Sequence, residues 1–371
     1  MKRLPDPVQK INAWVLGLDL HKRRTAWVLL DRKGHHVDEG WIDSRPEALR
    51  ELYRRVIGRK KAHVAFEAGG SSLWAFDTCL DLVKDEARIH AAHPKSVKAI
   101  ANSTQKNDMN DAWWLAYLTY EQRLPEGWIP RERYRELRVA TRERTACVQE
   151  RTRVIKRIHA HMRQAGRALP LGALGNAQGR TVLRAGLCEF STVLRLAIEH
   201  ALERIESLTS RIQTWEATIQ ELVSDWDEVD VLAQEMPGIR TTLAAVIVAE
   251  SGPITRFRHP KAYGRYTGLT PSERSSAGKT RFGKISKEGN PQLRWALTQA
   301  VAACLRTKHG SGVAVRNWIR ARQRRLGSCK KALVAAARKL AEAIWRLFAL
   351  GECFDLERMF GRVPPQVRLG T

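Results

Sequence analysis

The chain lacks the cysteine pattern of a disulfide frame or a zinc site. Its 371 residues include six cysteines, and no two of them form a CxxC pair. Paired spacing is the usual signature of a structural zinc site, whereas a dense cysteine framework is typical of small secreted domains. We therefore expect reduced thiols and a cytoplasmic protein.

The sequence also lacks long apolar runs, and its acidic residues do not outnumber its basic ones. The longest apolar run, at 243–249, is too short to reach the ~18 residues of a membrane span. The first fourteen residues contain no long apolar stretch, so no secretory signal is expected. Lys and Arg number 64 against 39 Asp and Glu, which gives a net charge of +25 and a pI near 10.3. This surplus favours a polyanionic partner, with nucleic acid as the first candidate and an acidic membrane surface as the rival.

The first part of the chain predicts an α/β sheet. At 14–30 two apolar runs flank the polar turn HKRR, which indicates a β-hairpin, and 36–43 is a candidate third strand. Strand-like and helical segments then alternate up to residue 130, as expected for a sheet with helices on its faces.

Beyond residue 130 the patterns become helical. Apolar residues from Ile198 to Leu222 recur at alternating steps of three and four, which predicts a coiled coil or a long antiparallel helix pair. Further on, a Ser/Gly/Lys-rich segment at 266–297 reads as a loop that runs into a helix. We expect three domains, at 1–130, 131–228 and 229–371.

Four acids stand where a sheet would present them to a metal ion. Asp19 lies between two leucines in the first strand, and Glu67 ends the strand AHVAFE. Asp108 and Asp111 are three residues apart and share one helical face. A buried acid costs free energy unless a cation compensates it, and Mg²⁺ prefers carboxylate oxygens. Two such ions about 4 Å apart support phosphodiester chemistry.

Each acid also has an ordinary structural interpretation. Asp108 and Asp111 suit the first turn of a helix, where negative charge is favoured by the helix dipole. Asp19 fits a paired acid near a turn equally well. Only the joint placement of the four favours a metal site.

The sequence resembles a known family at these residues and at several later blocks. It is similar to the DEDD-type insertion-sequence transposases of the IS110 group, relatives of the Piv-type DNA invertases and understood as bridge-RNA-guided recombinases. The similarity runs from about residue 14 to 350. The matching blocks are GLDLHK at 17–22, FEAGG at 66–70, KNDMNDAWWLA at 106–116, MPGI, YTGLTP, SSAGKTRFGKISKEGN and LRWAL.

The resemblance implies an α/β RNase H-like (RuvC-like) catalytic domain, followed by a helical coiled-coil region and a mainly α-helical transposase domain. In that family four acids bind Mg²⁺, and they correspond here to Asp19, Glu67, Asp108 and Asp111. A serine of the third domain acts as the nucleophile. Ser276 is the first choice, but Ala277 replaces the glycine that the family usually has after the serine, which leaves Ser275 open.

Basic residues around these motifs are candidates for nucleic-acid contact. Lys and Arg beside backbone amides are common phosphate ligands, although exposed turns and solvated helix faces have the same composition. Arg274 is a further source of positive potential near the serines. The candidates are His21, Lys22, Lys106, Lys279, Arg281, Lys284, Lys287 and Arg294.

The sequence thus predicts a site-specific DNA recombinase that moves an insertion sequence through a serine–DNA intermediate. By resemblance, its partners are donor and target DNA, a non-coding guide RNA and further copies of the chain in a dimer or tetramer. The expected location is the bacterial cytoplasm, at the nucleoid. The alternatives are a RuvC-like endonuclease in which water attacks, and a nucleic-acid-binding scaffold without catalysis.

Overall fold

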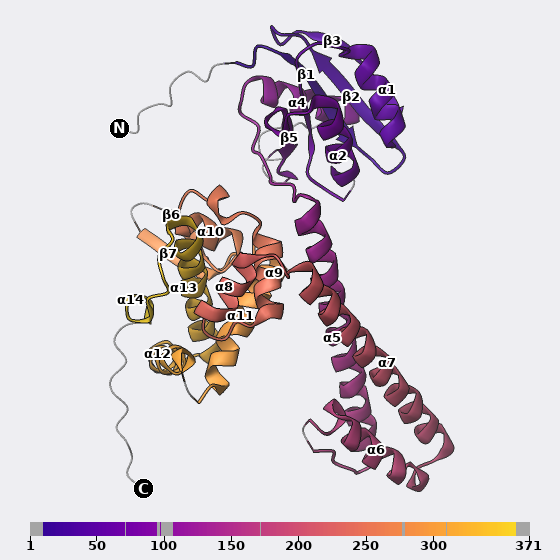
Figure 1. Cartoon of the computed structure of the whole chain (residues 1–371), viewed down its shortest axis with the longest axis vertical. Coiled ribbons are helices and arrows are strands. Elements are labelled where there is room, and N and C mark those ends of the chain that lie inside the picture. The colour runs from indigo at the N-terminus through magenta and orange to yellow at the C-terminus, as the bar shows by residue number, and fades with distance from the viewer. Residues whose placement is uncertain are drawn as a thin grey trace. The chain divides into compact units, whose positions relative to one another are not determined.

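The computed structural model describes residues 10–70, 72–94, 97, 107–170, 172–276, 279–308 and 310–360, with the backbone alone at 273–276 and 279–282. The chain divides into two compact units, residues 1–130 and 131–371, which have separate apolar cores (Figure 1). The expected division of the second unit after residue 228 stays a prediction.

A five-stranded mixed sheet organises the first unit. Its strands are β1 (Trp14–Leu20), β2 (Arg24–Leu30), β3 (His36–Asp43), β4 (Ala62–Glu67) and β5 (Ile89–Ala92). They lie in the order β3-β2-β1-β4-β5. The first three strands pair antiparallel, whereas β1–β4 and β4–β5 pair parallel. The predicted hairpin and third strand are confirmed, and the sheet with its helices fits an α/β RNase H-like domain.

Helices cover both faces of this sheet (Figure 1). They are α1 (Pro46–Val56), α2 (Ser72–Val83) and α4 (Asp108–Tyr120), with a short 3-10 turn η1 (Glu86–Arg88) before β5. Leu49 of α1 and Phe76 of α2 share a core with Leu16 and Leu18 of β1. Ala112 of α4 belongs to a second core on the opposite face, with Val15 and Val28.

Two long helices run along one another in the second unit (Figure 1). They are α5 (Glu132–Gln164) and α7 (Thr192–Leu222), and between them in sequence lie η2 (Ala173–Gly175), α6 (Ala177–Ala185) and η3 (Gly186–Glu189). Ion pairs join Arg144 to Glu216 and Arg204 to Glu150, so the two helices are antiparallel. Most of the predicted heptad positions are buried, namely Ile198, Ala201, Ile205, Leu208, Ile212 and Ile219.

The rest of the second unit is a helical core with one β-hairpin. Its elements are α8 (Asp227–Glu235), α9 (Thr241–Ser251), η4 (Ile254–Arg256), α10 (Pro260–Tyr266), β6 (Pro271–Ser276), β7 (Lys279–Ile285), α11 (Pro291–Arg306), α12 (Ser311–Leu326), α13 (Cys329–Leu350) and α14 (Leu356–Phe360). Helices α9, α11 and α13 contribute most of its buried residues. Within the described residues, no helix combines the length and apolarity needed to cross a membrane.

The hairpin corrects one expectation from the sequence. Residues 266–297 were expected to form a loop before a helix, but β6 and β7 pair antiparallel within this range. The strand sequences PSERSS and KTRFGKI are almost wholly polar. A strand with no apolar face lacks the alternation by which strands are recognised, so its pattern cannot be told from that of a loop.

Candidate metal centre

Strand alternation directs Asp19 and Glu67 toward helix α4. Side chains two residues apart in a strand face the same side of a sheet. Val15 packs in the core that contains α4, so Asp19 of the same strand faces that helix as well. In β4, Ala65 packs against Leu115 of α4, and Glu67 follows two residues later. Because β1 and β4 are parallel neighbours, with Leu18 opposite Phe66, both acids stand at the same end of the sheet.

Gly17 allows α4 to lie close to the sheet. A Cβ atom at this position would lie 2.1 Å from the carbonyl oxygen of Ala112 and 2.9 Å from the Cβ of Ala116. Any larger residue would therefore push the helix away from β1. This close approach sets the distance between the end of β1 and the first turn of α4.

The two aspartates of α4 belong to a well-defined helix start. The side chain of Asn107 accepts a hydrogen bond from the Met109 amide, and the Asp111 amide donates to the carbonyl oxygen of Asn107. Asn is a favoured N-cap because its side chain pairs an amide that the helix leaves free. The cap fixes the first turn and thereby the positions of Asp108 and Asp111.

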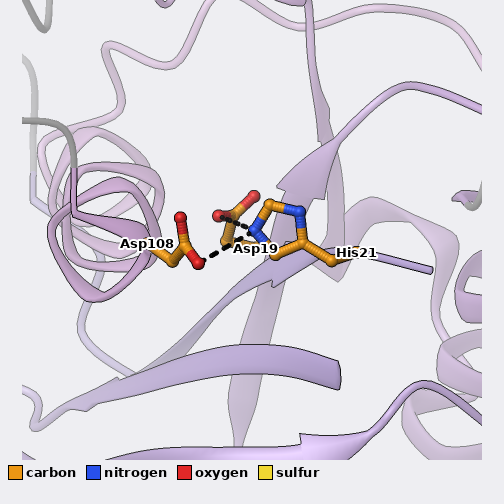
Figure 2. A group of neighbouring side chains, drawn as sticks. All are labelled: Asp19, His21 and Asp108. Atoms are coloured by element: carbon orange, nitrogen blue, oxygen red, sulfur yellow. Dashed lines mark ion pairs between the residues drawn. The ribbon is translucent and has the colours of Figure 1, made fainter. Parts of the chain in front are cut away.

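His21 joins the two elements (Figure 2). Its Nε2 atom lies 3.0 Å from Asp19 Oδ2 and 3.3 Å from Asp108 Oδ2. One potential ligand atom from each of these three residues lies within 4.8 Å of the others. The imidazole nitrogen stands between two carboxylates, at a position where the negative potential favours a cation.

All four predicted acids contribute to the electrostatic environment of this site. Burial raises the pKa of Asp19 to about 6, and His21 opposes the rise. The negative charges of Asp111, Asp108 and Glu67 raise this pKa further. Asp19 is only 9 % exposed. Its ionised form is therefore unfavourable in the folded protein, and a cation bound beside it would remove that penalty.

The four predicted acids lie at the same end of the sheet, but only two of them are in the tight group around His21. Asp19 and Asp108 meet at His21, whereas Glu67 and Asp111 lie outside this tight group. The sequence predicts a nucleic-acid contact for His21 and does not indicate that this side chain lies between the two carboxylates. The sequence feature that could have indicated this contact is the position of His21 two residues after Asp19. Lys22 is exposed, and Lys106 lies outside the described residues.

The predicted serines stand in the hairpin of the second unit. Ser275 pairs with Thr280 and Ser276 with Lys279 across β6 and β7, and Arg281 pairs with Arg274. Ser276 is thus the last residue of β6. Ala277 lies outside the described residues.

The segment that follows the hairpin is anchored at Asn290. Its side-chain Oδ1 caps α11 by accepting hydrogen bonds from the backbone amides of Gln292 and Leu293. Its side-chain Nδ2 donates to Glu250 Oε2 at 2.6 Å. Of the predicted phosphate ligands here, Lys284 and Lys287 are exposed, and Arg294 donates to the carbonyl oxygen of Thr267 at 3.3 Å.

Comparison with known families matches both units. A model of the DEDD domain of IS110-type proteins, described as "Transposase", matches residues 16–166. A second model, described as "Transposase IS116/IS110/IS902 family", matches residues 230–320. The chain belongs to the IS110 family of transposases. This confirms the resemblance seen in the sequence, and the matched ranges include Asp19, Glu67, Asp108, Asp111 and Ser276.

Curated relatives carry consistent names. The chain is 26% identical over 267 residues to the "Transposase for insertion sequence element IS1328" of Yersinia enterocolitica, which covers 71% of this chain and 77% of the relative. It is 25% identical over 351 residues to a "Probable family 20 transposase" of Pseudomonas aeruginosa, with 91% and 98% covered. A "Putative transposase y4qE" of Sinorhizobium fredii is 23% identical over 289 residues, with 76% and 70% covered. A DNA-processing protein of an insertion sequence is thus supported.

Proposed function

We propose that this IS110-family protein is a site-specific DNA recombinase that moves its insertion sequence by metal-dependent strand exchange. The observation that carries the proposal is the convergence of Asp19 and Asp108 on one point at the C-terminal end of β1, the central strand of an RNase H-like sheet. Glu67 and Asp111 act on the same point electrostatically. Four carboxylates gathered around a nearly buried position need a compensating cation.

The donor set fits Mg²⁺. Carboxylate oxygens are hard ligands of the kind that this ion prefers. We assign Asp19, Glu67, Asp108 and Asp111 as its ligands. Bound there, the metal would polarise the scissile phosphate and stabilise the charge that develops on its oxygens. His21 holds the carboxylates of Asp19 and Asp108 together in the absence of such an ion.

Ser276 is the proposed nucleophile, with Ser275 as the neighbouring alternative. Its hydroxyl oxygen forms a bond to a DNA phosphorus while one DNA oxygen leaves and takes up a proton. The serine proton passes to a base, so that one phosphodiester bond is exchanged for another. A DNA hydroxyl from a second strand later attacks the phosphoserine and releases the serine. Because each bond broken is replaced by another, strands rejoin without an external energy source.

The remaining partners follow from this activity. We propose that a non-coding RNA of the element selects donor and target DNA, and that Lys279, Arg281, Lys284 and Lys287 contact the phosphates of nucleic acid. Exchange between two duplexes requires several strands to be held at once. We therefore propose a homo-oligomer, a dimer or tetramer, acting at the bacterial nucleoid.

The test is a search for a covalent protein–DNA adduct. Protein is incubated with labelled element-end DNA, Mg²⁺ and the transcript that flanks the gene, and the products are separated under denaturing conditions. We expect an adduct in the wild type that is lost in Ser276→Ala and in Asp19→Ala. Ser275→Ala is the matched control and should retain it.

Other outcomes would favour the other functions. Free cleaved ends with Ser276→Ala fully active would indicate a RuvC-like endonuclease in which water attacks. Binding without cleavage in any divalent metal would indicate a scaffold. An adduct lost in Ser275→Ala but kept in Ser276→Ala would move the nucleophile by one residue.

A further inference from the structure

One long stretch of the second unit contains no acid. Between Glu288 and Glu342 the sequence has twelve Lys or Arg and no Asp or Glu. This stretch forms α11, α12 and the first half of α13. The three helices share the apolar core of the unit, so the cations of the stretch are carried on its outer surface. None of the acids proposed to bind metal belongs to it.

Several of these twelve cations have structural partners. Arg316 donates to the carbonyl oxygen of Thr307, and Lys339 donates to that of Met359. Arg338 pairs with Glu342, and the guanidinium of Arg322 lies 5.6 Å from the ring centre of Trp318. These contacts stabilise the fold, which is sufficient reason for the presence of these four cations.

Five others gather where α12 turns into α13. Val315 and Ile319 are buried, whereas Arg320 and Arg324, one turn apart, share an exposed face of α12. Only Gly327, in the left-handed conformation, and Ser328 separate this helix from α13. The last turn of α12 therefore adjoins the first turn of α13. We call this group the cationic corner: Arg320, Arg324, Arg325, Lys330 and Lys331.

The side chains of the cationic corner are all exposed and, among the described residues, none of them has an ion pair or hydrogen bond. The surface of α5 and α7 is different. There, Arg204 of α7 pairs with Glu150 of α5, and Arg144 of α5 pairs with Glu216 of α7. Acids therefore lie beside some of the cations of this helix pair. The cationic corner has none.

Folding accounts for only part of this arrangement: Arg324 and Arg325 stand in the last turn of α12, where the helix dipole favours cations. Like charges within a Debye length of about 8 Å repel one another at physiological salt. Lys330 and Lys331 also occupy the first turn of a helix, where the positive end of the dipole disfavours cations. The corner thus costs the protein stability, and a polyanion bound to it would offset that cost.

We propose that the cationic corner binds the phosphodiester backbone of nucleic acid. The guanidinium group of arginine forms bidentate hydrogen bonds with phosphate oxygens, and each neutralised phosphate releases counterions. The family model ends at residue 320, so the other four cations lie beyond the range that it matches. The inference rests on the proposed function in taking nucleic acid as the partner. It does not require the metal site or the serine.

The test measures binding in the full-length protein without Mg²⁺, so that it is independent of strand exchange. Arg320, Arg324, Lys330 and Lys331 are replaced together by Gln. The matched control replaces four exposed cations of the first unit by Gln, with the same loss of charge. These are Arg32, Lys33, Arg59 and Lys61. Fluorescence anisotropy is recorded with a labelled DNA duplex and, separately, with a single-stranded RNA, over about 50–200 mM salt.

We expect the corner variant to lose at least about tenfold in affinity for one or both probes at 0.15 M salt, and the control to lose clearly less. Each lost phosphate contact should lower the slope of log K against log salt by about 0.9 on duplex DNA, so a fall of about 2–4 is expected. Loss on DNA alone or on RNA alone assigns the corner to that nucleic acid. The thermal midpoint should stay unchanged or rise.

Equal losses in the corner and control variants would overturn the proposal, because net charge alone would then account for binding. So would unchanged nucleic-acid affinity together with lost binding to anionic lipid vesicles, which would assign the surface to a membrane. A second variant guards against misfolding: Arg320→Lys with Arg324→Lys keeps the charge and should retain most of the affinity.

Discussion

Arg142 holds both oxygens of a fully buried carboxylate. Its Nε atom donates to Glu250 Oε1 at 2.7 Å and its Nη2 atom to Oε2 at 3.0 Å. Asn290 donates to the same carboxylate from the segment after the β6–β7 hairpin, and Arg138 lies 3.5 Å from it. A glutamate of α9 thus ties α5 to the N-cap residue of α11, the first helix after the proposed serine hairpin.

Loss of the Glu250 charge should destabilise the second unit. Glu250→Gln leaves the guanidinium of Arg142 and the partly buried one of Arg138 without their carboxylate, and breaking a buried pair in this way typically costs about 3–5 kcal/mol. Urea unfolding should show the loss as a lower midpoint. Glu216→Gln, which removes the half-exposed partner of Arg144, is the control and should cost less than about 1 kcal/mol. Similar costs for the two variants would contradict the role of Glu250.

Asp19→Asn should stabilise the metal-free protein at pH 7.5. Because the folded-state pKa of Asp19 is raised to about 6, the unfolded chain releases this proton more readily, and stability falls as the pH rises from about 4 to about 6. Above pH 6 the full cost is about 3 kcal/mol, at 1.36 kcal/mol per pKa unit. The amide cannot ionise, so the variant should avoid most of this cost. The measurement is thermal unfolding of both proteins in EDTA at pH 4 and pH 7.5. The stability of Asp19→Asn relative to the wild type must be greater at pH 7.5 than at pH 4.

The same variant should lose the response to Mg²⁺. A cation that binds the folded state alone at about 100 times its Kd stabilises the protein by roughly 3 kcal/mol. The wild type should show this gain in thermal unfolding, whereas Asp19→Asn and Asp108→Asn should show little of it. Asp31→Asn, in the turn after β2, is the control and should respond as the wild type does. Equal gains in all four proteins would place the ion elsewhere.

Gly17→Ala should disturb the first unit. The added methyl would lie 2.1 Å from the Ala112 carbonyl oxygen, so α4 must move away from the sheet. Overpacking of this kind costs about 1–3 kcal/mol. It should also weaken the Mg²⁺-induced stabilisation, because Asp108 moves with the helix. Gly69→Ala meets no atom within 4 Å and serves as the control, which should keep both properties.

His63 should make the first unit sensitive to acid. Burial lowers its pKa to about 4, and the neighbouring His90, whose Nε2 lies 2.8 Å from His63 Nδ1, contributes to the shift. The folded state thus holds His63 neutral, and the associated stability is complete above pH 6.5 and is lost as the pH falls toward 4. His63→Gln should flatten this dependence between pH 4 and 6.5. An unchanged slope would show that another group governs acid unfolding.

The local patterns of the sequence predicted most elements of the fold. Alternating apolar residues marked β1 and β2, and the spacing from Ile198 to Leu222 marked the buried side of α7. These signals are strong because each comes from neighbouring residues that face one core. The hairpin β6–β7 escaped because its polar strands carry no such alternation.

The candidate site was only partly readable in the same way. Asp108 and Asp111 were recognised at the start of a helix, and Asp19 and Glu67 within strands. The sequence did not indicate that His21 bridges Asp19 and Asp108, since that contact depends on how closely α4 approaches β1. The basic character of 311–350 and the absence of acids between Glu288 and Glu342 are visible in the sequence, but the gathering of five cations where α12 meets α13 is not.

The sequence by itself determined the periodicity of each element, the caps that start its helices, the family and the acids that a metal would need. Only the tertiary structure decided which of these acids meet and at what distance. Caps and periodicities act within a few residues of the chain. The meeting of Asp19 with Asp108 instead depends on the packing of α4 against β1 and on the space that Gly17 leaves for that helix.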